Sequence, residues 1–139
     1  MNMKDERQFV GYSKYRSRLV DGHVHTELCP HGSGDRTAMM IEKAIELRIE
    51  KVCLTEHAPL PTAFAAEYGG DKKAYDTASL KLNEVDTYLE LGRQLQRAYG
   101  THIDISLGFE VDYIPGFESD IQEFLDRYGP LTDDNILSV

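Results

Sequence analysis

A chain of 139 residues is long enough for one domain with a modest core, and its 41% hydrophobic and 28% charged residues are typical of globular proteins. A membrane span needs roughly 18 apolar residues in a row, and no such run occurs. The net charge of −9 argues against a nucleic-acid surface, which requires clustered Lys and Arg. Residues 1–17 lack the apolar stretch of a secretion signal, and Cys29 and Cys53 are too few for a disulfide framework. We therefore expect a cytoplasmic protein that binds neither membranes nor nucleic acid.

The first part of the chain predicts an arm, a strand and a helix. Residues 1–17 form an arm of unassigned role, and a single domain follows at 18–139. Residues 18–25 are predicted to form a strand, and the loop at 26–36 is rich in turn formers. A helix then runs to about Arg48, capped by Asp35 or Thr37. Its apolar positions recur with helical spacing at Ile41, Ala44, Ile45 and Ile49.

The middle of the chain predicts a second strand, a long loop and a second helix. The strand covers residues 51–55 and ends at Glu56-His57. Residues 58–77 carry two prolines and Gly69-Gly70, which predicts a loop that is functional or mobile. Ser79 can cap a helix that stops at Gly100. Its apolar stripe consists of Leu82, Val85, Leu89, Gly92 and Leu95.

The last part predicts a third strand at 103–111, a helix at about 117–128 and a fourth strand at 135–139. Strands that alternate with helices indicate a parallel α/β architecture. Candidate polar residues fall at the carboxyl ends of the first three strands, where barrels and doubly wound sheets build their sites. No glycine-rich phosphate loop follows any strand, which argues against a doubly wound nucleotide-binding fold.

Two histidines two residues apart, His23 and His25, carry the strongest chemical signal. In an extended backbone, residues i and i+2 point to the same face, so both imidazoles can reach one metal ion. His31 and His57 also lie just after predicted strands, whereas His102 is interpreted as incidental. Four of the five histidines therefore gather in two short segments at strand ends.

A mixed set of imidazoles and one carboxylate suits zinc, iron or manganese. The candidate ligands are His23, His25, His31, His57 and Glu110. Such cations would also let an acidic protein bind an anionic substrate. The alternatives to metal binding are a hydrogen-bonded loop histidine at position 57 and a surface charge at position 110.

Three neighbouring residues keep two interpretations each. Glu56 orients an imidazole or is solvated, and for Asp112 solvation is favoured over ligation. Cys29 is a soft ligand beside His31 or, as the favoured interpretation, a small half-buried residue.

Four motifs resemble the polymerase-and-histidinol-phosphatase (PHP) superfamily over residues 19–139, and within it the histidinol-phosphate phosphatases. They are Asp-Gly-His-Val-His-Thr, Cys-Pro-His-Gly-Ser, Leu-Thr-Glu-His-Ala-Pro-Leu-Pro and Gly-Phe-Glu-Val-Asp-Tyr-Ile-Pro. The resemblance implies a distorted (β/α)7 barrel with up to three metal ions. It assigns His23 and His25 to the first motif, His31 to the following loop, His57 to the second motif, and Glu110 to the bridging carboxylate. Some relatives have a carboxylate in the loop, so Glu27 or Asp35 competes with His31.

The resemblance also implies a second half of the barrel, with further ligands and phosphate-binding arginines. It places another histidine directly after a Ser-Val pair like Ser138-Val139. We therefore expect 18–139 to be the N-terminal portion of the barrel, with exposed edges that lead to self-association, exchange of elements or docking to a C-terminal half.

The reaction implied for the complete enzyme is hydrolysis of L-histidinol phosphate to L-histidinol and phosphate, a step of histidine biosynthesis. Metal-bound hydroxide is the expected nucleophile, in preference to covalent catalysis by Cys29. The alternatives are a PHP phosphoesterase for nucleotides or nucleic-acid ends, and an inactive metal-binding half-domain. Residues 58–77 would be a lid whose Lys72 and Lys73 reach the phosphate, or simply a surface turn.

Overall fold

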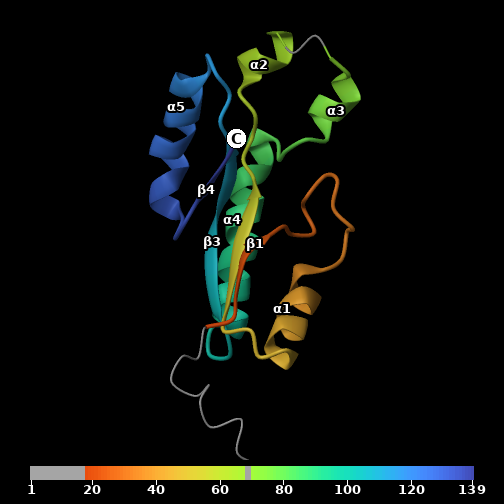
Figure 1. The fold of residues 1–139 in the computed structure, drawn as a ribbon, viewed down its shortest axis with the longest axis vertical. Coiled ribbons are helices and arrows are strands. Elements are labelled where there is room, and N and C mark those ends of the chain that lie inside the picture. Colours follow the sequence, from red (N-terminus) through yellow and green to blue (C-terminus); the bar gives the residue numbers. More distant parts are fainter. Residues whose placement is uncertain (1–17, 68–69) are drawn as a thin grey trace, which may run out of the picture.

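A computed structural model describes residues 18–67 and 70–139, so the predicted arm at 1–17 and Gly69 lie outside the described residues. Its centre is a parallel sheet in which neighbouring strands follow one another in the chain. The strands, in sheet order, are β1 (Val20–Val24), β2 (Lys51–His57), β3 (Asp104–Asp112) and β4 (Ile136–Ser138). The carboxyl ends of β1, β2 and β3 therefore lie at the same edge of the sheet (Figure 1).

Helices connect the strands, and two more short helices lie beyond the carboxyl end of β2 (Figure 1). The bounds are α1 (Thr37–Glu46), α2 (Thr62–Glu67), α3 (Lys72–Asp76), α4 (Val85–Tyr99) and α5 (Glu118–Tyr128), with 3-10 turns η1 (Leu82–Glu84) and η2 (Gly129–Leu131). No helix in the described part of the chain is long and apolar enough to span a membrane.

The hydrophobic core lies between the sheet and its helices. Tyr88 of α4 and Phe109 of β3 are fully buried, with ring centroids 5.3 Å apart. Alternate residues of β3 build this layer, because successive side chains of a strand point to opposite faces. The opposite face of β3 is also buried at Ser106 and Glu110. The core therefore fixes β3, and with it the direction of Glu110.

The predicted alternation of strands and helices is confirmed, with bounds that differ by a few residues. Two predicted caps are wrong. Arg36 precedes α1 without a side-chain cap, and the Thr37 amide donates instead to the Glu27 carboxylate at 2.6 Å. Ser79 is buried, and its hydroxyl accepts from the Leu60 amide at 3.3 Å and donates to the Leu80 carbonyl at 3.2 Å.

The long loop predicted at 58–77 is also wrong, because it contains α2 and α3. Asp71 caps α3 by accepting from the Lys73 amide. The second main helix begins only at Val85, so Leu82 lies in η1 and is exposed rather than in the buried stripe. As predicted, α4 stops at Gly100, whose amide donates to the Gln96 carbonyl.

We predict that Gly92→Ala destabilises the fold by about 1–3 kcal/mol, because the added methyl would overpack a filled core. A Cβ at Gly92 would collide with Cδ1 of Leu107, which is itself fully buried and has little room to move. Chemical denaturation measures the change. Gly129→Ala is the matched control, since its backbone is also helical and its Cβ would meet nothing within 4 Å. Equal effects of the two substitutions would contradict the prediction.

Candidate metal centre

One carboxylate oxygen lies among three imidazoles at the carboxyl edge of the sheet. Glu110 Oε2 is 2.9 Å from His23 Nε2, 3.3 Å from His25 Nε2 and 3.2 Å from His57 Nδ1. The residues come from β1, the residue after it, β2 and β3. His57 and Glu110 are partners in the β2–β3 register, so the parallel pairing alone brings them together.

The imidazole nitrogens also face one another. His23 Nε2 lies 3.0 Å from His25 Nε2, which confirms that the two rings share a face. His57 Nε2 lies 3.1 Å from His31 Nε2. His57 Nδ1 is buried and makes no hydrogen bond of acceptable geometry, although Glu110 Oε2 is close. Converging nitrogens with a carboxylate and an unpartnered buried nitrogen are the donor chemistry of a transition-metal site.

The protonation states suit metal binding. Burial lowers the pKa of His57, and the neighbouring His25 adds to this effect more than Glu110 opposes it. For Glu110, burial would raise the pKa, but the hydrogen bond with His23 and the nearby imidazoles lower it. A neutral imidazole and an ionised carboxylate are the forms that bind metals.

Glu56 is a fully buried carboxylate that contacts two residues of the cluster, the His25 ring and the His57 backbone amide. Its Oε2 accepts from the Thr26 amide at 2.9 Å and hydroxyl at 2.7 Å, and its Oε1 accepts from the His57 amide at 3.1 Å. Oε1 also lies 3.0 Å from His25 Nδ1. Burial would raise the pKa of Glu56, but these hydrogen bonds lower it overall. Of the two interpretations of Glu56, orientation of an imidazole fits this geometry and solvation does not.

Tyr88 and Thr26 support the centre, although the sequence analysis assigns a chemical role to neither. The Tyr88 hydroxyl donates to the Gly108 carbonyl at 2.6 Å and accepts from the Glu56 amide at 3.3 Å. Tyr88 thus connects β2 and β3 through residues that lie next to His57 and two positions before Glu110. Its position three residues after Val85 in the apolar stripe predicts burial, but the pairing of its hydroxyl depends on the fold.

The loop candidate His31 lies beside the cluster, and its two carboxylate competitors are engaged elsewhere. His31 Nδ1 lies 2.8 Å from the Thr77 carbonyl, which directs Nε2 toward His57. Glu27 binds the Thr37 amide at the start of α1. Asp35 accepts from the Ser33 hydroxyl at 2.9 Å. This arrangement favours His31 over Glu27 or Asp35.

The remaining candidates lie outside the cluster. Asp112 is half-buried and lines a cavity of about 250 Å³ between α5 and the segment after β2. Lys72 is exposed and pairs with Asp76 at 2.7 Å. The roles of Lys72 and Lys73 in phosphate binding, and of the segment as a lid, stay predictions.

Comparison with known families identifies the fold. Residues 21–137 match the PHP domain. The chain belongs to the PHP domain family. The four parallel strands are thus part of a PHP-type α/β barrel, as expected.

The chain is similar to histidinol-phosphatase of Bacillus subtilis, with 40% identity over 119 residues. It superposes on a crystal structure of HisK from Listeria monocytogenes with a TM-score of 0.84 at 42% identity, covering 86% of this chain and 44% of that one. For histidinol phosphate phosphatase from Lactococcus lactis, solved with zinc, L-histidinol and phosphate, the TM-score is 0.65 at 26% identity, covering 88% of this chain and 40% of that one. The alignment with the Bacillus subtilis protein covers 86% of this chain but 42% of that protein, so the chain spans less than half of its relative.

We predict that Glu56→Gln lowers the free energy of unfolding by roughly 1–3 kcal/mol, because one buried donor loses its acceptor. Metal affinity should fall on the order of 10- to 100-fold, the usual loss when a partner that orients a ligand is removed. Denaturation and metal titration measure the two effects. Glu46→Gln, at an exposed ion pair on α1, is the matched control and should change both by little. Unchanged metal affinity in Glu56→Gln would contradict the positioning role.

Proposed function

We propose that the chain forms part of a metal-dependent phosphomonoester hydrolase, and that its substrate is L-histidinol phosphate, hydrolysed to L-histidinol and phosphate. The cellular role proposed with it is histidine biosynthesis in the cytoplasm. The observation that carries the proposal is the Glu110 carboxylate set among three imidazoles at the carboxyl edge of a PHP-type sheet. The similarity to histidinol-phosphatases supports the substrate.

The donor set fits zinc, iron or manganese, and we propose His23, His25, His31, His57 and Glu110 as the residues that would hold up to three such ions in a complete site. Bound divalent ions would supply a Lewis acid for the phosphoryl oxygens and an activated water for attack at phosphorus.

The chain's own residues prepare the imidazoles for this role. Glu56 is ionised and can only accept, so the His25 proton must sit on Nδ1 and the Nε2 lone pair faces the cluster. The Thr77 carbonyl fixes the His31 proton on Nδ1 in the same way. Two imidazoles are thus oriented before any ion binds, and ionised Glu110 brings the negative charge that attracts one.

A chimaera tests the function. Residues 21–137 would replace the matching segment of the Bacillus subtilis histidinol-phosphatase, and phosphate release from L-histidinol phosphate would be measured. We expect activity that Glu110→Gln reduces at least about 100-fold, the scale seen when a single electrostatic group is removed from an active site. Glu118→Gln, at the exposed start of α5, is the matched control and should keep the activity.

The same assay separates the alternatives. A folded chimaera that releases phosphate from nucleotides but not from L-histidinol phosphate would favour a nucleotide-acting PHP phosphoesterase. A folded chimaera that binds metal and hydrolyses neither substrate would favour the inactive half-domain.

We also propose that this segment pairs with a second copy or with a further part of the barrel. β1 and β4 form the outer strands of the sheet, and each has one strand neighbour within residues 18–67 and 70–139. Apolar side chains stand exposed there, with Val20 50% and Leu137 63% exposed. Unpaired edges of this kind invite pairing with another chain.

Sedimentation of the 139-residue chain across a range of concentrations tests the pairing. We expect association that weakens in Leu137→Lys, because a charge on an edge strand opposes pairing. Leu47→Lys, at an exposed leucine just after α1, is the control and should leave association unchanged. A monomer at every concentration would contradict pairing with a second copy, and would leave pairing with a further part of the barrel as the proposal.

A further inference from the structure

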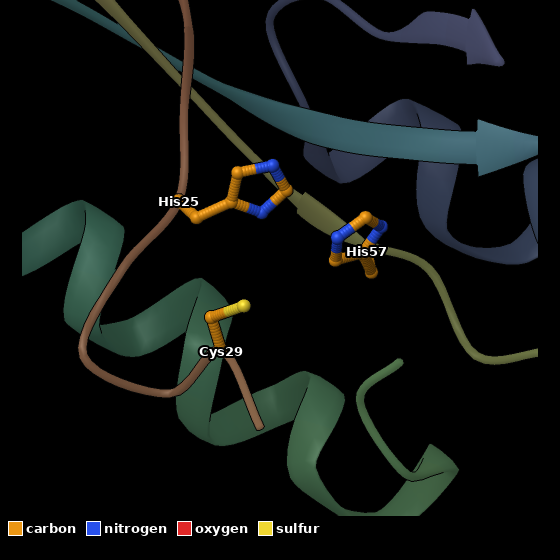
Figure 2. Close-up of side chains that lie close together, drawn as sticks. All are labelled: His25, Cys29 and His57. Carbon is orange, nitrogen blue, oxygen red and sulfur yellow. The ribbon is translucent and has the colours of Figure 1, made fainter. Parts of the chain in front are cut away.

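Cys29 points toward the imidazole cluster from the loop between β1 and α1. Figure 2 shows its sulfur directed into the space between the rings of His25 and His57. One donor atom from each of these three residues lies within 4.8 Å of the others. Cys29 is 8% exposed, so water has little access to the thiol. The two rings themselves are stacked, with centroids 4.3 Å apart.

The Cys-Pro-His-Gly turn holds the sulfur in this position. The Cys29 amide donates to the Thr26 carbonyl and the Gly32 amide donates to the Cys29 carbonyl, both at 3.1 Å. A Cβ at position 32 would lie 3.1 Å from Cys29 Cβ, so the turn is tight and a larger residue would press on the thiol.

A cation at this place would meet the sulfur and both imidazoles, because one donor atom from each of the three residues lies within 4.8 Å of the others. The buried Nδ1 of His57, without a hydrogen-bond partner, is a further donor in the same cluster.

We propose that Cys29, His25 and His57 form a sulfur-containing donor set for a soft divalent cation such as Cd²⁺ or Zn²⁺, distinct from the carboxylate set around Glu110. The inference rests on the metal centre of the proposed function and concerns which ion that centre selects. On binding, the S–H bond breaks, a sulfur–metal bond forms and the proton passes to solvent.

The two donor sets compete because they share His25 and His57. The Nδ1 of His25 faces Glu56 and its Nε2 faces His23 and Glu110, so a cation beside Cys29 must take one of these nitrogens from its present partner. Thiolates prefer soft ions and carboxylates prefer ions such as Mn²⁺. Soft ions should therefore engage Cys29, whereas Mn²⁺ should bind through Glu110 without the sulfur.

Cd²⁺ titration of the 139-residue chain tests the proposal, because thiolate–cadmium bonds give an ultraviolet charge-transfer band. We expect the band in the wild type, its loss in Cys29→Ser, and a drop in Cd²⁺ affinity of at least about tenfold. Mn²⁺ affinity should change little in Cys29→Ser. Cys53→Ser is the matched control, because Cys53 is the other buried cysteine, lies on β2 and belongs to neither donor group found among the described residues.

The ¹¹³Cd chemical shift of the wild type reports whether sulfur binds the ion. It therefore tests the proposal even if Cys29→Ser does not fold. A shift of a sulfur-bound ion supports the proposal, and a shift of an ion with only nitrogen and oxygen ligands overturns it. A band that survives Cys29→Ser, or disappears in Cys53→Ser, also overturns it. If Mn²⁺ binds and Cd²⁺ gives no thiolate signal, this inference fails alone; if neither ion binds, the metal centre of the proposed function fails with it.

Discussion

The buried Glu56 carboxylate is the interaction on which the rest of the centre depends. A charge removed from water is unfavourable unless it is hydrogen-bonded, and Glu56 accepts from two groups of Thr26, from the His57 amide and from His25. These contacts join the segment after β1 to the end of β2. The same carboxylate therefore stabilises the fold locally and orients an imidazole, so fold and site cannot be changed independently there.

Parallel strand pairing is the second constraint. The β2–β3 register places His57 opposite Glu110, and Tyr88 of α4 connects the same two strands through Glu56 and Gly108. Gly92 allows α4 to pack closely on β3, because a Cβ at this position would collide with the Leu107 side chain. Core packing thus determines the distances among groups that lie at the edge of the sheet.

The centre is also more varied chemically than a set of imidazoles. Three donor types, namely nitrogen, carboxylate oxygen and sulfur, meet around His25 and His57. Which of these donors bind depends on the metal ion, since donors of different softness favour different metals. The α2–α3 segment is connected to this chemistry by the bond between His31 and the Thr77 carbonyl.

The sequence alone determined the order of strands and helices, the shared face of His23 and His25, and the PHP family, because these depend on local periodicity and on motifs. Only the tertiary structure decided that Glu27 binds the start of α1 and that Glu56 is buried, since each depends on residues at least ten positions away. The helices α2 and α3 were not predicted, because segments of five or six residues are too short to show a helical period and the prolines and glycines around them indicate a loop. The direction of the Cys29 sulfur likewise depends on a turn whose packing no local pattern specifies.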